Sequence, residues 1–178
     1  IKINTAKIDS DRTLLSDVPQ KFYLVKEEII KILPISFVIE EEQKLILEMV
    51  DYRKIFCCQG IHYAANILDP CFKGIILSEY KDTEGINLIV DTVNKFDSAR
   101  ILANLAQYRA NENIWENESI WESSKNISPL TWWSGLMNNQ PLYAIVKILF
   151  FIPALSAAPE RVRSAFGNTH KIKKKIDQ

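Results

Sequence analysis

The segment SAAPERVRSAFG, residues 156–167, contains the acid of this chain that is best placed for chemistry. Glu160 follows a helix-start signal at Ser156 and is itself followed by Arg161. Such a carboxylate can bind a Mg²⁺-type ion, but a two-metal site needs further acids close to it in space. In the first turn of a helix, the same carboxylate instead stabilises the helix dipole by about 0.3–1 kcal/mol. The local pattern favours the structural interpretation and leaves the catalytic one open.

Two other groups of residues invite a chemical interpretation. Asp69 stands in an Asp-Pro pair, where a carboxylate usually accepts a hydrogen bond from a backbone N–H within a turn. Cys57, Cys58, His62 and Cys71 include zinc-ligand residue types, but they lack the paired C-x2-C spacing of convincing zinc sites. Free cysteines more often act as small buried hydrophobic residues. We therefore predict a turn at Asp69 and packing roles for the cysteines.

The C-terminal tail HKIKKKIDQ is basic. A run of this kind is usually a solvated surface, but it can also contact DNA phosphates without reading sequence. The weak candidates for phosphate contact are Arg161, Lys171, Lys173, Lys174 and Lys175.

Composition limits the class of protein. The chain has 178 residues, of which 47% are hydrophobic, and its 22 basic and 22 acidic residues balance, so no global field favours nucleic acid or a membrane. Three cysteines form no even disulfide framework, which points to a reducing compartment. The most apolar stretch, residues 142–155, is too short to span a bilayer and contains Lys147 and Pro153. We therefore predict a buried core helix there and no membrane partner.

Helical periodicity dominates the chain, so the predicted fold is mainly α. Ser16 or Asp17 is a plausible N-cap for the first helix, and Ser128 with Pro129, then Pro141, mark later helix starts. The predicted helices cover 18–33, 36–58, 61–68, 83–112, 128–137, 141–152 and 156–167. Residues 111–128 are predicted to be a helix or an ordered linker, and 74–80 and 150–153 are candidate short strands.

Adjacent tryptophans and the apolar helix after them are the main candidates for packing or for an interface. Neighbouring residues of a helix point about 100° apart, so Trp132 and Trp133 can contact two surfaces. Core packing is the default, and an interface is the second choice because Trp is enriched in buried contacts. The candidate dimer or packing residues are Trp132, Trp133, Leu142, Ile145, Val146 and Leu149.

The order of these motifs resembles the C-terminal part of hAT-family DNA transposases. HYAANILDPCFKG, residues 62–74, supplies a histidine and the LDP motif, and residues 129–170 supply the WW helix, the apolar helix, the ER…S…G helix and a histidine. The resemblance covers roughly residues 15–175. Arg163 departs from the pattern, because the family usually has an aromatic or apolar residue there.

The resemblance implies an RNase H-like transposase core with a helical insertion, of which this chain would be a helical fragment. Residues 1–125 would be the end of the insertion, and 126–178 the C-terminal dimerisation region. Family members bind Mg²⁺ or Mn²⁺ with two aspartates and one glutamate. The glutamate corresponds to Glu160, whereas both aspartates lie upstream of the matched region.

The resulting prediction is a C-terminal fragment of a hAT-type transposase or a derived protein. It would dimerise with itself or with another hAT-type protein, and by itself it would need no cofactor and catalyse nothing, because one carboxylate of three cannot hold two metals. One alternative is the tail of an active nuclear transposase, in which Glu160 completes the acidic triad and the parent protein binds DNA. A second alternative is a non-functional transposon relic.

Overall fold

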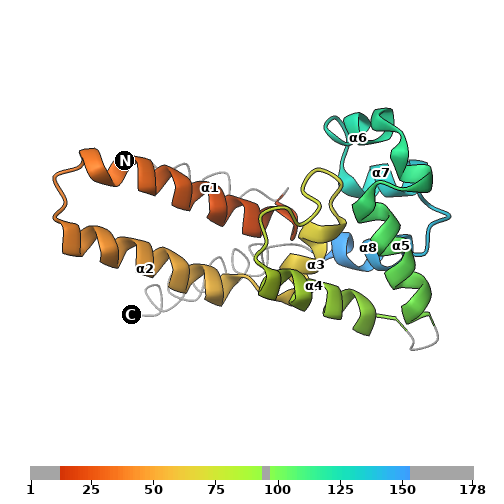
Figure 1. The fold of residues 1–178 in the computed structure, drawn as a ribbon, viewed down its shortest axis with the longest axis horizontal. Helices are drawn as coiled ribbons and strands as arrows, with labels where there is room; N and C mark the ends of the chain where they lie inside the picture. The colour runs from red at the N-terminus through yellow and green to blue at the C-terminus, as the bar shows by residue number, and fades with distance from the viewer. Residues whose placement is uncertain (1–12, 94–96, 153–178) are drawn as a thin grey trace, which may run out of the picture.

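The computed structural model describes residues 13–93 and 97–152, and over these ranges the chain is helical (Figure 1). An extended hairpin of α1 (Asp17–Ile32) and α2 (Glu40–Cys57) projects from a compact body. The α-helices of the body are α3 (Gly60–Leu68), α4 (Glu79–Asp91), α5 (Ser98–Ala110), α6 (Glu118–Ser124), α7 (Pro129–Leu136) and α8 (Tyr143–Phe151). The short 3-10 helices are η2 (Leu33–Ile35) and η3 (Asn113–Glu116). The predicted mainly α fold is confirmed.

The two candidate strands are wrong for the part of the chain that the structure describes. Residues 71–76 form turns after α3, and α4 begins soon afterwards at Glu79. Phe150 and Phe151 belong to α8. Short apolar runs suit a buried helix as well as a strand, so periodicity alone could not separate them.

Among the helices that the structure describes, α1 and α2 pack against each other along most of their length (Figure 1). Pro34 cannot supply a backbone donor to a continuing helix, and α1 gives way to η2 at this position. A salt bridge of 2.7 Å joins Lys26 Nζ of α1 to Asp51 Oδ2 of α2. Within residues 13–93 and 97–152, α1 is the helix that packs along α2, and none of the side chains of α2 is fully buried.

Ser16 connects this hairpin to the body. It precedes α1 as expected, but its side chain makes no cap hydrogen bond. Its hydroxyl instead donates to Asp69 Oδ2 at 2.7 Å, and its carbonyl accepts from Asn66 Nδ2 at 2.8 Å. Ser16, one of the two predicted N-cap residues, thus occupies the N-cap position without a side-chain cap bond, because a buried carboxylate takes the hydroxyl.

The long helix expected over residues 83–112 is two helices. α4 ends at Asp91, with Thr92 Oγ1 donating to Leu88 O at 2.7 Å, and α5 begins at Ser98. The break lets both helices contribute to one cluster, since Ile89 and Ile101 are both buried there. In one continuous helix these two residues would lie about 18 Å apart along the helix axis.

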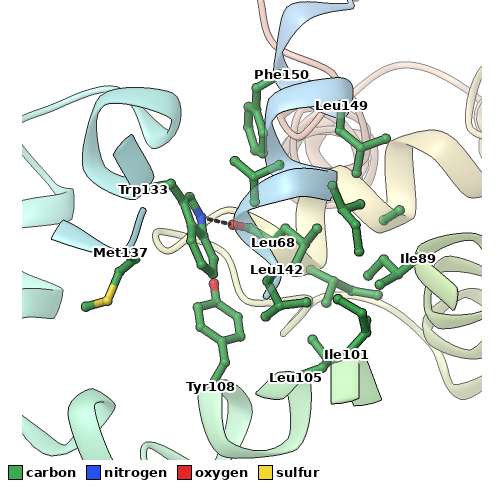
Figure 2. Packing of buried hydrophobic residues seen from close by; sticks show 14 of the residues in the cluster. Leu68, Ile89, Ile101, Leu105, Tyr108, Trp133, Met137, Leu142, Leu149 and Phe150 are labelled. Carbon is green, nitrogen blue, oxygen red and sulfur yellow. Dashed lines mark hydrogen bonds between the residues drawn. The ribbon is translucent and has the colours of Figure 1, made fainter. Parts of the chain in front are cut away.

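The hydrophobic core lies in the body, where α3, α4, α5, α7 and α8 meet (Figure 2). α7 begins as predicted, with Pro129 in the first position and Ser128 Oγ accepting from Thr131 N at 3.2 Å. α8 begins at Tyr143, two residues later than the expected start at Pro141. The core contains residues from both sides of the boundary expected near residue 125.

Over residues 13–93 and 97–152, no helix combines the length and apolar composition that crossing a membrane requires.

Candidate functional site

Five aromatic side chains from four elements form one cluster in the body. Tyr108 comes from α5, Trp115 from η3 and Trp121 from α6, and α7 supplies Trp132 and Trp133. Neighbouring rings of the cluster have centroids 5.2 to 6.0 Å apart, in stacked, tilted and edge-to-face arrangements. Such pairs contribute about 0.5–1.5 kcal/mol each beyond the area that they bury. The cluster therefore fixes α5, α6 and α7 relative to one another.

Indole N–H groups connect this cluster to the backbone. Trp132 Nε1 donates to Ile120 O at 2.8 Å, and Trp121 Nε1 donates to Trp115 O at 2.7 Å. Trp133 Nε1 donates to Leu68 O at 2.8 Å, as Figure 2 shows. Leu68 belongs to the LDP motif, so this last bond joins the LDP and WW motifs directly.

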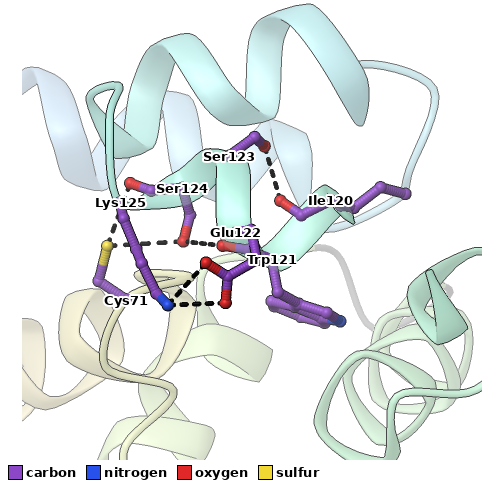
Figure 3. Close-up of polar contacts among 7 residues, drawn as sticks. All are labelled: Cys71, Ile120, Trp121, Glu122, Ser123, Ser124 and Lys125. Carbon is purple, nitrogen blue, oxygen red and sulfur yellow. Dashed lines mark hydrogen bonds and ion pairs between the residues drawn. The ribbon is translucent and has the colours of Figure 1, made fainter. Parts of the chain in front are cut away.

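The turn after Leu68 is built as predicted. Asp69 is 2% exposed, and its Oδ1 accepts from Cys71 N at 2.9 Å. Cys71 Sγ in turn contacts Ser124 O at 3.2 Å, which connects the turn to α6 (Figure 3). Burial raises the pKa of the Asp69 carboxyl to about 6, although hydrogen bonds from Ser16 and Cys71 favour the charged form.

This raised pKa predicts a pH-dependent stability. An Asp carboxyl in the unfolded chain titrates near 3.9, so between about pH 4 and 6 the folded chain binds the Asp69 proton more tightly. The contribution of Asp69 to the free energy of unfolding is therefore greatest below pH 4 and is lost as pH rises through 6, by up to roughly 3 kcal/mol.

Asp69→Asn is expected to remove this dependence, because an amide keeps the acceptor for Cys71 N without titrating. Urea unfolding of the variant and of the wild type at several pH values measures the difference between the two slopes. Asp91→Asn is the control, since this carboxylate is exposed at the end of α4. Parallel slopes for wild type and Asp69→Asn would contradict the prediction.

A small cavity of about 290 Å³ lies beside this turn. Both lysines that line it have partners: Lys125 pairs with Glu122 at 2.6 Å, and Lys73 contacts Asn111 and stands 4.0 Å from the Trp121 ring centroid. Although Cys71 is exposed as a residue, the partial burial of its thiol raises the pKa of that group, which favours the unreactive protonated form. The lining supplies no activated nucleophile.

The residues considered for zinc do not converge. Cys57 and Cys71 are exposed, Cys58 is buried, and His62 Nδ1 accepts from Gln59 N at 3.1 Å in a capping box. Among the residues that the structure describes, no group of three or more His, Cys, Asp or Glu side chains is arranged to hold a metal ion.

α8 places one face in the core and the other at the surface. Asn104 of α5 holds the start of α8, because its Oδ1 accepts from Leu142 N at 3.4 Å and its Nδ2 donates to Gln140 at 2.8 Å. On the outer face, Ile148 is 52% exposed and Phe151 is 74% exposed. With Ala144, which is also exposed, they are spaced i, i+4, i+7, so they line one side of the helix.

The six residues expected in dimerisation or packing all lie in the core. Trp132, Trp133, Leu142, Ile145, Val146 and Leu149 are between 0 and 2% exposed. A direct contact between these side chains and a partner stays a prediction. The outer face of α8 is not among the predicted site residues, although the spacing of Ala144, Ile148 and Phe151 is visible in the sequence.

The other predicted site residues lie outside the described residues. These are Glu160, Arg161, Lys171, Lys173, Lys174 and Lys175, together with the final predicted helix over 156–167. The catalytic and DNA-contact interpretations of these residues stay predictions.

Comparison with known protein families gives a match in the C-terminal half of the chain. Residues 104–175 match the family described as the hAT family C-terminal dimerisation region. No curated protein sequence and no solved structure matches the chain. The match begins within α5 at Asn104, the residue that holds α8, and it contains the whole aromatic cluster. Residues 104–175 are therefore a hAT-type C-terminal dimerisation region.

Proposed function

We propose that this chain associates with a second hAT-type chain, either another copy of itself or a related protein, through the outer face of α8. The observation that carries the proposal is the division of α8 into two faces within a dimerisation region. The side chains of its inner face, which include Ile145 and Leu149, are buried in the core. The exposed Ile148 and Phe151 are therefore the apolar side chains of α8 that a partner can cover.

The charged residue beside this face is placed so that a partner could cover the face without burying the charge. Lys147 lies beside the face on α8, and its Nζ stands 5.0 Å from the Tyr143 ring centroid. This position keeps the ammonium over an aromatic surface, while the lysine stem covers apolar area. Aromatic and aliphatic side chains with a charged rim are the usual composition of an interface.

Ile148→Glu and Phe151→Glu are each expected to weaken association at least tenfold. Each places a carboxylate in an apolar contact, where an unpaired charge is costly. Because both side chains point outward, the variants should keep wild-type unfolding curves. Sedimentation equilibrium over a concentration series measures the dissociation constant.

Ile75→Glu is the matched control. Ile75 is 82% exposed and lies outside residues 104–175. Association that survives both α8 variants, or that Ile75→Glu disrupts equally, would rule out the outer face of α8 as the contact.

We further propose that the chain by itself lacks catalysis and needs no cofactor, and that Mg²⁺ or Mn²⁺, the RNase H-like core, DNA binding and the nuclear location belong to a longer parent protein. The support is the family resemblance, which assigns one acid of three to this chain. Metal-dependent cleavage of DNA by the chain alone, lost in Glu160→Gln, would overturn this proposal.

A further inference from the structure

α2 carries an apolar stripe on the side that faces away from α1. Leu45, Met49, Tyr52 and Phe56 are 56, 57, 72 and 75% exposed, and we call these four residues the outer seam. At 100° per residue, the seam lies nearly opposite the half-buried Leu47 and Val50 of the same helix. α2 is therefore apolar on two sides, and among the described helices α1 covers one of them.

The spacing of the outer seam indicates the shape of what would cover it. Successive members are four, three and four residues apart, which is the a and d spacing of a heptad repeat. Single exposed apolar residues are common, but a continuous stripe along successive turns marks a binding surface. A stripe with this period fits a second helix that runs nearly parallel to α2 in space.

Charges on both sides of the seam indicate which helix this is. Glu48 occupies the flanking g position and Arg53 the flanking e position, and neither makes an ion pair within the described residues. In a parallel pair of identical helices, each g residue faces the e residue five positions later on the other helix. Glu48 of each copy would thus meet Arg53 of the other, twice by symmetry.

An antiparallel arrangement has no such match. It places g residues against g residues and e residues against e residues, so Glu48 would face Ile55 of the other copy and Arg53 would face Ile46. Neither the carboxylate nor the guanidinium would then meet an opposite charge. Charge complementarity therefore selects a parallel pairing.

We propose that a second copy of this chain binds along the outer seam of α2, parallel to it, with Glu48 of each copy paired to Arg53 of the other. This contact lies outside residues 104–175 and adds a second surface to the self-association proposed above. Two heptads alone form a marginal contact. The pairing therefore rests on the proposed function. The C-terminal contact holds two copies together and so raises the effective concentration of one α2 near the other, which strengthens the pairing.

Charge exchange tests the pairing in the whole 178-residue chain. Glu48→Arg sets arginine against Arg53 twice and should raise the dissociation constant roughly tenfold in sedimentation equilibrium. The double variant Glu48→Arg with Arg53→Glu should restore the wild-type value. Residues five apart do not face each other within one helix, so a rescue reports contact between copies. Lys44→Glu, an exposed change away from the seam, is the control.

Cross-linking tests the orientation. Parallel pairing sets position 49 against position 49, whereas antiparallel pairing sets it against position 52. Met49→Cys, in a chain in which the exposed Cys57 and Cys71 are replaced by serine, should therefore form a disulfide-linked dimer under oxidising conditions. Lys44→Cys in the same background should not.

The outcomes separate the two proposals. A dimer that Phe151→Glu disrupts but Glu48→Arg leaves unchanged would overturn the seam pairing and keep the proposed function. A dimer that Glu48→Arg weakens, that the double variant restores and that Phe151→Glu leaves unchanged would establish the seam and overturn the α8 contact. A chain that stays monomeric at high micromolar concentration would overturn both.

Discussion

Trp133→Ala is expected to lower the free energy of unfolding by about 4 kcal/mol, the largest effect of any single truncation that we predict. Trp133 is 0% exposed, and its ring centroid lies within 5.5 Å of those of Tyr108, Trp115 and Trp132. Truncation leaves a cavity among rings held by four elements, which cannot close without moving a helix. It also removes the donor to Leu68 O, so a buried carbonyl loses its indole partner.

Two further variants divide this effect into its parts. Trp133→Phe keeps most of the ring contacts and loses the indole donor, so it should cost less than Trp133→Ala. Tyr80→Ala removes an aromatic residue that is 77% exposed and should change the free energy of unfolding by less than 0.5 kcal/mol, as surface substitutions usually do. Urea unfolding followed by circular dichroism suits the series, because fluorescence changes when a tryptophan is removed. A loss below about 1 kcal/mol for Trp133→Ala would contradict the predicted role.

Sequence patterns located the helices well where local chemistry determines their ends. Ser128 and Pro129 start α7 through a side-chain cap and a fixed φ, both properties of adjacent residues. Ser16 shows the limit of such reasoning. It has a good capping side chain, yet its hydroxyl goes to Asp69, which is 53 residues away along the chain. A local pattern cannot rank a distant buried carboxylate against a nearby backbone N–H.

The same limit applies to the candidate site. The sequence marked Trp132 and Trp133 as residues that could pack inside or face a partner, and both interpretations fit two aromatics on a helix. Only the positions of Trp115 and Trp121, in a segment of irregular periodicity, show that the tryptophans are enclosed by their own chain. Once these side chains are enclosed, the apolar surface left on α8 is the opposite stripe, at Ile148 and Phe151.

The LDP and WW motifs are also easier to understand together than separately. Leu68 and Trp133 are 65 residues apart, and the indole of one binds the carbonyl of the other at 2.8 Å. Asp69 then holds the following turn and the start of the hairpin through Cys71 and Ser16. The two motifs are thus halves of one structural unit, which gives their joint occurrence a physical reason that does not depend on catalysis.

Gly85→Ala tests a close approach of α3 and α4 in the body and is expected to lower the free energy of unfolding by about 2–3 kcal/mol. A Cβ at Gly85 of α4 would stand 2.7 Å from Cδ1 of Ile67 and 3.0 Å from the backbone nitrogen of Ala64, both in α3. Ile67 can change its rotamer, but the backbone of α3 cannot yield without moving the helix. The higher helix propensity of alanine, worth about 1 kcal/mol, offsets only part of this cost.

Gly135→Ala is the matched control, because the same methyl group is added to a helix where nothing lies within 4 Å. Gly135 is exposed on α7, so the variant should gain the propensity term alone and become more stable by about 0.5–1 kcal/mol. Urea unfolding of the two variants therefore measures opposite signs for one chemical change. A gain in stability for Gly85→Ala would mean that α3 and α4 are further apart than the contact at Gly85 requires, since only a looser packing leaves room for the methyl group.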